Sequence, residues 1–208
     1  MIAAVTVDWT TAAPAKDRRV RRSRSALMRA AVALVTERDS TAVPVSDIAE
    51  AADVSRQVLY QQFGDRDALV LEAALDLVRR ELLAGLADAE HRQGGRAAML
   101  ALGRHFAEHR RFYRALLTGS CAFALNKALT GLFLPLNRQS LELLPGERLD
   151  DRTAEDLAAF MTGGAAVVVN TWVVEGPDPL DPEEFTDRLM RLWSVVLGTI
   201  TTAGEPGR

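Results

Sequence analysis

Residues 44–69 read PVSDIAEAADVSRQVLYQQFGDRDAL, and their pattern predicts two short helices joined by a tight connection. Apolar spacing indicates a first helix over residues 45–52, and residues 53–54 form the connection. Ser55 stands where a helix N-cap belongs, because its hydroxyl can accept a hydrogen bond from a backbone amide of the first turn. The second helix covers residues 56–63, with an apolar stripe of Val58, Leu59 and Phe63 and an outer side carrying Arg56, Gln57, Tyr60 and Gln61. Such a pair is a known way to hold one helix rigidly enough to enter a DNA major groove.

Length and composition favour a helical protein of one large or two small domains, with 208 residues of which 48% are hydrophobic and 6% aromatic. The longest apolar stretch, residues 158–174, is interrupted by two glycines and an asparagine, so no transmembrane helix is expected. Residues 1–17 lack the basic start and apolar core of a signal peptide. The single cysteine, Cys121, excludes an internal disulfide and fits a reducing compartment, so a cytoplasmic protein is expected.

The net charge of −3 conceals an asymmetry along the chain. Residues 1–30 carry seven basic and two acidic side chains, a balance of +5, so the other 178 residues carry −8. A basic front on an acidic body is typical of a DNA-binding end joined to a body that does not bind DNA. A solvated, disordered basic tail would give the same pattern.

Hydrophobic periodicity predicts an all-α fold of about nine helices, because no segment shows a convincing strand alternation. Residues 1–17 show no period and are expected to be disordered. Pro44 suits a helix entrance, Gly64 ends the second short helix, and Asp65 can cap a long helix that follows. Besides the two short helices, the pattern predicts helices over residues 18–38, 66–88, 96–108, 112–117, 121–144 with Pro135 as a kink or interruption, 153–175 and 182–202.

Residues 26–70, ALMRAAVALVTERDSTAVPVSDIAEAADVSRQVLYQQFGDRDALV, resemble the DNA-binding domain of the tetracycline-repressor (TetR) family. Eleven positions carry the resemblance in register: Ala30, Ala31, Leu34, Ile48, Ala49, Val54, Ser55, Leu59, Tyr60, Phe63 and Leu69. The resemblance implies a three-helix DNA-binding domain over residues 18–70, with its helix-turn-helix at 44–63. It also implies that the long fourth helix joins this domain to a helical ligand-binding and dimerisation domain over residues 71–208.

The chain departs from the family pattern at several positions of the motif. Asp39 and Asp53 stand where glycine is usual, and an aspartate can still adopt the left-handed conformation, though less readily. Pro44 replaces a common threonine, and residues 57–58 replace a common small residue and threonine. The fold tolerates these changes, whereas the base preference of relatives does not carry over.

The resemblance implies DNA contacts by Ser46, Ser55, Arg56, Gln57, Tyr60, Gln61 and Arg66. Tyr60 would donate its hydroxyl to a phosphate, although a half-buried packing role is the alternative. Arg56 would read a base edge or contact a phosphate. The basic run over residues 18–24 would lie along phosphates, reach a minor groove, or add only non-specific affinity.

The body is expected to pair two chains and to enclose a ligand. The last two predicted helices carry the proposed homodimer surface, at Gly164, Ala165, Val168, Leu189, Trp193 and Val196, although these stripes would also serve the body's own core. The middle helices are expected to enclose an effector cavity, with candidates Phe106, Phe112, Tyr113, Cys121, Phe123, Asn126, Met161, Asn170 and Trp172.

Residues 105–109, HFAEH, match the H-x-x-E-H pattern of a zinc peptidase helix, although three fixed positions make a weak signal. A regulatory metal site using His105, His109 and either Cys121 or Glu108 is a further alternative. The chain contains no nucleophile elbow and no phosphate-cradling glycine loop, so neither an enzyme nor a cofactor is expected. The sequence therefore predicts a homodimeric repressor that binds operator DNA and is released by a small molecule. A helical adaptor that has lost DNA binding is the alternative.

Overall fold

The protein folds as helices throughout the part of the chain that the structure, a computed structural model, describes: residues 15–83, 95–142 and 149–203. Those residues form nine α-helices and one π-helix and no strand, which confirms the predicted all-α class. The front domain comprises α1 (Ala15–Arg38), α2 (Val45–Ala51), α3 (Arg56–Phe63) and α4 (Arg66–Leu77). The body comprises the π-helix η1 (Val78–Leu83), α6 (Gly95–Glu108), α7 (Arg110–Leu117), α8 (Ala122–Glu142), α9 (Asp151–Glu175) and α10 (Pro182–Ala203).

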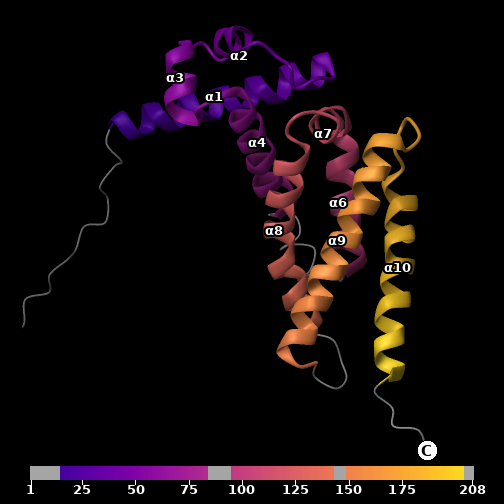
Figure 1. Ribbon diagram of the computed structural model, residues 1–208. Helices are drawn as coiled ribbons and strands as arrows, with labels where there is room; N and C mark the ends of the chain where they lie inside the picture. The colour runs from indigo at the N-terminus through magenta and orange to yellow at the C-terminus, as the bar shows by residue number, and fades with distance from the viewer. Residues whose placement is uncertain (1–14, 84–94, 143–148, 204–208) are drawn as a thin grey trace, which may run out of the picture.

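Figure 1 shows α1, α2 and α3 together at one end of the molecule and α4 descending from them into the body. The first helix begins at Ala15 rather than at residue 18, so residues 15–17 are not part of a disordered arm as predicted. The rest of that arm, residues 1–14, lies outside the described residues. In the body, α8 continues through Pro135 without the interruption that the sequence suggested.

Local signals in the front domain form as the sequence predicts. The side chain of Ser55 accepts a hydrogen bond from the amide of Val58 and caps α3. The side chain of Asp65 accepts one from the amide of Ala68 at 2.7 Å and caps α4. Asp39 and Asp53 both adopt positive φ, of 48° and 53°, so each takes the left-handed conformation that relatives give to glycine. These turns set the angles at which α2 and α3 follow α1.

One apolar cluster runs without a break from the front domain into the body. It includes Leu27 of α1, Leu59 of α3, Leu69 of α4, Tyr113 of α7 and Phe185 of α10, all of them buried. Helix α4 packs against α1 and against α8, so it belongs to the cores of both parts. The front domain is therefore fixed to the body by shared apolar burial.

The connecting helix differs from the sequence prediction in its second half. The α-helical spacing was expected to continue from residue 66 to residue 88, but α4 ends at Leu77 and the chain continues as the π-helix η1 from Val78 to Leu83. A π-helix closes its hydrogen bonds over five residues instead of four, which rotates the following side chains relative to α-helical register. Residues 84–88 lie outside the described part of the chain.

The body touches the front domain at the turn between α7 and α8. A Cβ atom at Gly119 would come within 2.6 Å of the Thr41 Oγ1 atom and 2.8 Å of the Ala115 carbonyl oxygen. Arg111 donates to the carbonyl of Glu37 at 3.0 Å, and Ser120 donates to a carboxylate oxygen of Asp67 at 2.7 Å. The contact is therefore close-packed, with polar links on either side.

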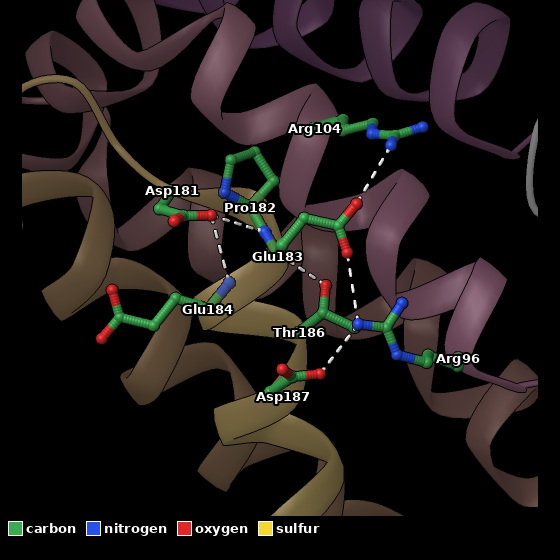
Figure 2. Close-up of polar contacts among 8 residues, drawn as sticks. All are labelled: Arg96, Arg104, Asp181, Pro182, Glu183, Glu184, Thr186 and Asp187. Carbon is green, nitrogen blue, oxygen red and sulfur yellow. Dashed lines mark hydrogen bonds and ion pairs between the residues drawn. The ribbon is translucent and has the colours of Figure 1, made fainter.

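Figure 2 shows how the start of α10 is held against α6. Asp181 caps α10, because its Oδ1 accepts hydrogen bonds from the amides of the second and third residues after it, at 2.9 and 3.1 Å. Arg96 of α6 contacts both Glu183 and Asp187, and Arg104 contacts the other oxygen of Glu183 at 3.2 Å. These side chains are exposed, so each pair contributes little energy and the network mainly sets the angle between the two helices.

By length and composition alone, α9 would suffice to cross a membrane, as would α7 and α8 together if their bend counted as one span. The two glycines and the asparagine that the sequence analysis took as interruptions lie within one continuous helix. Within its most apolar window, 33% of α9 is buried inside the protein, and the helix packs against α7 and α8. A core helix of a helical body can be as long and as apolar as a membrane-crossing helix.

The left-handed turn at Asp53 predicts a stability difference between two substitutions. Asp53→Gly relieves the strain of positive φ but gains freedom in the unfolded chain, so the free energy of unfolding should change by less than about 1 kcal/mol. Asp53→Val, which is β-branched, should lower it by at least about 1 kcal/mol. Urea unfolding measures both, with Asp156→Val at an exposed helical position as the control. Equal stability of the valine and glycine variants at position 53 would contradict the turn.

Candidate DNA-binding surface and ligand cavity

The outer side of α3 is a polar surface of four exposed side chains: Arg56, Gln57, Tyr60 and Gln61. Tyr60 is 51% exposed, whereas Leu59 beside it is fully buried. About half of the tyrosine is therefore accessible to a partner, while the other half packs on the front domain. An aromatic hydroxyl, an arginine and two amides thus project together from one short, capped helix.

Helix α3 is held from behind by Arg24 of α1. One guanidinium nitrogen of Arg24 donates to the carbonyl of Gln62 at 3.0 Å, and another contacts Glu72 of α4 at 2.9 Å. The guanidinium also lies 4.3 Å from the centre of the Phe63 ring. A cation at the last turn of a helix interacts favourably with the helix dipole and the ring face. Arg24 therefore has a structural role within the front domain. This corrects the prediction that it belongs with the phosphate-binding run over residues 18–24.

The remaining predicted DNA residues stand around this surface. Arg18, Arg19, Arg21 and Arg22 are exposed at the start of α1. The other three have partners within the front domain: Ser46 donates to Asp47, Ser55 caps α3, and Arg66 contacts the carboxylate of Asp67 at 2.9 Å.

The carboxyl group of Asp67 links this surface to the body. The hydrogen bond from Ser120 and, after it, the contact with Arg66 hold the pKa of Asp67 below its ordinary value, against the effect of partial burial. The carboxylate therefore stays charged between α4 and the first residues of α8.

The body encloses a cavity of about 470 Å³, which lies within the size range of small-molecule sites. Three of the predicted ligand residues line it, namely Phe106, Asn126 and Asn170. Four of its polar side chains form two hydrogen-bonded pairs: Asn170 donates to Asn126, and Asn137 donates to Thr162, each at 2.7 Å. The apolar part of the lining, which the sequence analysis missed, includes Met99, Leu102, Leu129, Leu132, Phe133 and Leu136. The α8 members of that set recur at helical spacing, which was the available signal.

The other predicted ligand residues do not line this cavity. Phe112 and Tyr113 are fully buried in the shared core, and Phe123 is 81% exposed on α8. The Trp172 ring stacks on the Phe185 ring with centroids 3.9 Å apart. Met161 belongs to a separate small apolar cluster between α8 and α9. Cys121 is buried with its sulfur 3.8 Å from the carbonyl oxygen of Asp67. The ordinary packing role applies to all of these residues except the exposed Phe123.

The predicted dimer residues divide between interior and surface. Ala165, Leu189 and Trp193 line the cavity, and Leu189 is only 2% exposed, so these three serve the interior of their own chain. Val168 and Val196 are partly buried against the two apolar clusters. Gly164 is exposed. Among the described residues, the large exposed apolar side chains of these helices are instead Phe160 and Val167 of α9, at 69% and 65%, and Leu192 and Val195 of α10, at 46% and 68%.

Glu81, His105 and His109 form a separate cluster where η1 meets the end of α6. The Glu81 Oε2 atom lies 2.7 Å from Nε2 of His109 and 3.7 Å from Nδ1 of His105. The hydroxyl of Tyr113 lies 2.8 Å from the His105 Nε2 atom. Burial and then the neighbouring His109 lower the pKa of His105 to about 4, although Glu81 acts in the opposite direction. His105 is therefore neutral near pH 7.

The members of this cluster differ from both alternatives predicted for residues 105–109, the zinc peptidase helix and the regulatory metal site. Glu108, the expected base of a zinc peptidase, is exposed and does not belong to the cluster, and neither does Cys121. The third member, Glu81, comes from the π-helix and was not found from the sequence.

The comparisons with known proteins bear first on the front domain. Residues 27–73, which span the last part of α1 and all of α2 and α3, match the family of bacterial regulatory proteins described as the tetR family. The N-terminal domain belongs to the tetR family. No curated protein matches the chain.

Solved structures of tetR-family regulators share the fold of most of this chain. A protein from Rhodococcus sp. described as a TetR-family transcriptional regulator is 19% identical, with a TM-score of 0.59 over 85% of this chain and 98% of that chain. The TetR family repressor AlkX from Dietzia sp. is 22% identical, with a TM-score of 0.58 over 85% and 98%. The repressor FadR of Thermus thermophilus, solved with lauroyl-CoA, is 23% identical, with a TM-score of 0.54 over 81% and 92%. These likenesses show that the front domain and the helical body together have the fold of these structures.

Proposed function

We propose that the protein is a non-enzymatic, cytoplasmic transcriptional regulator that binds operator DNA as a homodimer and responds to an apolar small molecule. The observation that carries this proposal is the outer side of α3, where Arg56, Gln57 and Tyr60 project from a helix that Arg24 fixes from behind. A helix held in this way can enter a major groove as a rigid body. Repression is the simplest mode, because a bound dimer can block a promoter without any activation surface.

The residues of α3 would divide their roles by position. Arg56 and Gln57 stand at the start of the helix, the part that reaches base edges, where arginine suits guanine and glutamine suits adenine. Tyr60, one turn further on, would donate its hydroxyl to a phosphate. The exposed arginines of residues 18–22 would add sequence-independent attraction to the DNA backbone.

Pairing of two chains would use the exposed apolar face of α9 and α10, made of Phe160, Val167 and Leu192. Gly163 and Gly164 lie on the same helix, and a Cβ atom at either would meet nothing within 4 Å. An apolar face with two glycines lets a second helix approach closely and removes the face from water. A two-fold pair presents the same surface on both chains and sets two recognition helices at a fixed spacing.

The effector would occupy the cavity between α6, α8 and α9. Its apolar lining fits a molecule with a hydrocarbon body, and the paired asparagines fit one or two hydrogen-bonding groups. The names of two similar structures point the same way, since one contains lauroyl-CoA and the other is implicated in the biodegradation of n-alkanes. We therefore propose a medium-length acyl or alkyl compound as the effector class.

Coupling between the cavity and the outer side of α3 would run through direct contacts between helices. Phe106 on the cavity wall belongs to α6, which leads directly into α7. Helix α7 and the turn that follows it hold the front domain through Arg111 with Glu37 and Ser120 with Asp67. An effector that prefers one position of α6 would shift these contacts and change the spacing of the two recognition helices.

Selection of bound fragments from random-sequence DNA tests the proposal as a whole. We expect a palindromic site with two half-sites and an affinity that falls steeply with salt. If the folded protein binds no duplex even at low ionic strength, it is instead a helical adaptor.

Tyr60→Phe is expected to weaken operator binding at every operator sequence, because it removes one phosphate contact and leaves the ring in place. A gel-shift titration at fixed salt measures the change. Thr118→Val, which removes one exposed hydroxyl from the α7–α8 turn, is the control. Unchanged affinity of the phenylalanine variant would remove Tyr60 from the DNA contact.

Arg56→Ala is expected to relax the preference at one base position in each half-site, at a cost of roughly 1–3 kcal/mol for the preferred base. Binding measured against a set of operators with single substitutions gives the preference at each position. A loss of equal size for every operator would make Arg56 a phosphate contact.

The dimer surface predicts that Val167→Asp shifts the protein from dimer to monomer, because it places a charge in an apolar face. Sedimentation at micromolar concentration measures the state, and Val20→Asp, at another exposed valine, is the control. A wild-type protein that sediments as a monomer would contradict the proposed pairing.

Ala166→Phe is expected to fill the cavity, because Ala166 lines it on α9. Displacement of a fluorescent apolar dye by laurate should therefore be strong for the wild type and weak for this variant. Ala33→Phe, at an exposed alanine of α1, should behave as the wild type. Equal displacement from both variants would place the acyl chain elsewhere.

A further inference from the structure

The cluster of Glu81, His105 and His109 is not used by the proposed DNA and effector sites. The carboxylate lies on the π-helix η1, His105 lies in the last turn of α6, and His109 lies one turn further on, at the N-cap of α7. One nitrogen of each histidine and one carboxylate oxygen lie within 4.8 Å of one another. Three donor atoms of this kind on converging elements are the ligand set that zinc and related divalent metals take.

Two of the three separations between the ligand atoms are close to those of a metal site. In a tetrahedral zinc site, bonds of about 2.0 Å place neighbouring ligand atoms about 3.3 Å apart. The Glu81 Oε2 atom lies 3.7 Å from the His105 nitrogen and 2.7 Å from the His109 nitrogen, so these separations lie on either side of that value. A small rotation of the partly exposed carboxylate would equalise them.

The buried histidine is already oriented for such a role. His105 is 6% exposed, and its Nε2 atom lies 2.8 Å from the hydroxyl of Tyr113. If Nε2 carries the proton and donates it to that oxygen, the lone pair of Nδ1 points toward Glu81 and His109. Metal-binding histidines are commonly fixed in this way through their second ring nitrogen. The low pKa of His105 also keeps the ring neutral, the form that binds a metal.

We propose that Glu81, His105 and His109 form a binding site for one divalent transition metal of the zinc class. Two imidazole nitrogens and one carboxylate oxygen would bind the ion, and a fourth position would remain for water or another ligand. Glu81 is 39% exposed and His109 is 20% exposed at their side chains, so the ion reaches the site from that side. The π-helix is what turns Glu81 toward α6, and such helices are frequent at functional sites.

A bound ion would tie the end of the connecting helix to the last turn of α6. Glu81 follows α4 directly, and His109 immediately precedes α7. The metal would therefore stabilise the folded protein and fix α6 at the end that leads toward the front domain. The inference does not depend on DNA binding, because it concerns only the described residues of the body.

Titration of the full-length, metal-stripped protein with Co²⁺ tests the proposal, since the visible absorption of Co²⁺ reports its ligands. We expect one Co²⁺ per chain, displaced by one Zn²⁺. Glu81→Gln and His109→Gln should each weaken Co²⁺ binding by at least about tenfold. Removing a residue that only hydrogen-bonds to a metal ligand already costs that much affinity, and these two residues would be ligands themselves. Glu108→Gln, which changes an exposed carboxylate outside the cluster, should bind as the wild type.

Two further measurements separate a metal site from a hydrogen-bonded cluster. Zn²⁺ should raise the unfolding temperature of the wild type but not that of Glu81→Gln, because a ligand that binds only the folded state stabilises it. Tyr113→Phe should weaken Co²⁺ binding by roughly 10- to 100-fold while preserving the aromatic core. Circular dichroism verifies the helical fold of each variant, and if one ligand variant is unfolded the other decides. No Co²⁺ binding by the wild type, or equal binding by wild type and folded ligand variants, would overturn the proposal.

Discussion

Five side chains of α4, from Leu69 to Leu77, are buried, and the helix packs against α1 on one side and against the body on the other. Burying a leucine or valine completely contributes about 1.5–3 kcal/mol, so this one helix carries a large share of the energy that joins the two parts. The front domain is too small to form a wide core of its own. Through α4, its apolar side chains share one buried cluster with those of α7 and α8. Its position is therefore a property of the whole molecule.

That dependence explains how a small domain can hold α3 rigidly enough for a functional surface. The polar contacts around it, such as Arg24 with the carbonyl of Gln62 and Glu72, fix direction more than they add stability, because they are partly exposed. Apolar burial supplies the energy, and the charge network selects one orientation. The same division holds at the other end of the molecule, where Arg96 and Arg104 orient α10 over an apolar contact with α6.

The sequence was sufficient to predict features that depend on neighbouring residues. It was insufficient for contacts between segments that lie far apart along the chain. Ser55, Asp65 and the left-handed Asp53 act within a few residues, so caps, turns and helix ends could be predicted from them. Arg24 looks the same in sequence whether it faces DNA or α3, because its partners lie 38 and 48 residues away.

The cavity lining, the exposed face of α9 and the Glu81 cluster were harder to predict from the sequence for a related reason. Phe106 and Phe112 both lie on inward faces, and only the packing of several helices decides which one borders a void. Helix α9 is apolar on nearly every side, so spacing could not separate the exposed Val167 from the covered Val168. Glu81 was missed because the π-helix shifts side chains out of the register that an α-helical reading assumes.

The close approach of Gly119 to Thr41 limits how the molecule can move. The Thr41 side chain leaves no space for an added carbon at the α7–α8 turn, so movement of the front domain toward the body at this point meets close contact. A tilt of the front domain about the contact meets less resistance, and the contact can then act as a pivot. A sub-ångström shift beneath it would then become a larger arc at the far tip of α3, in proportion to the length of the lever.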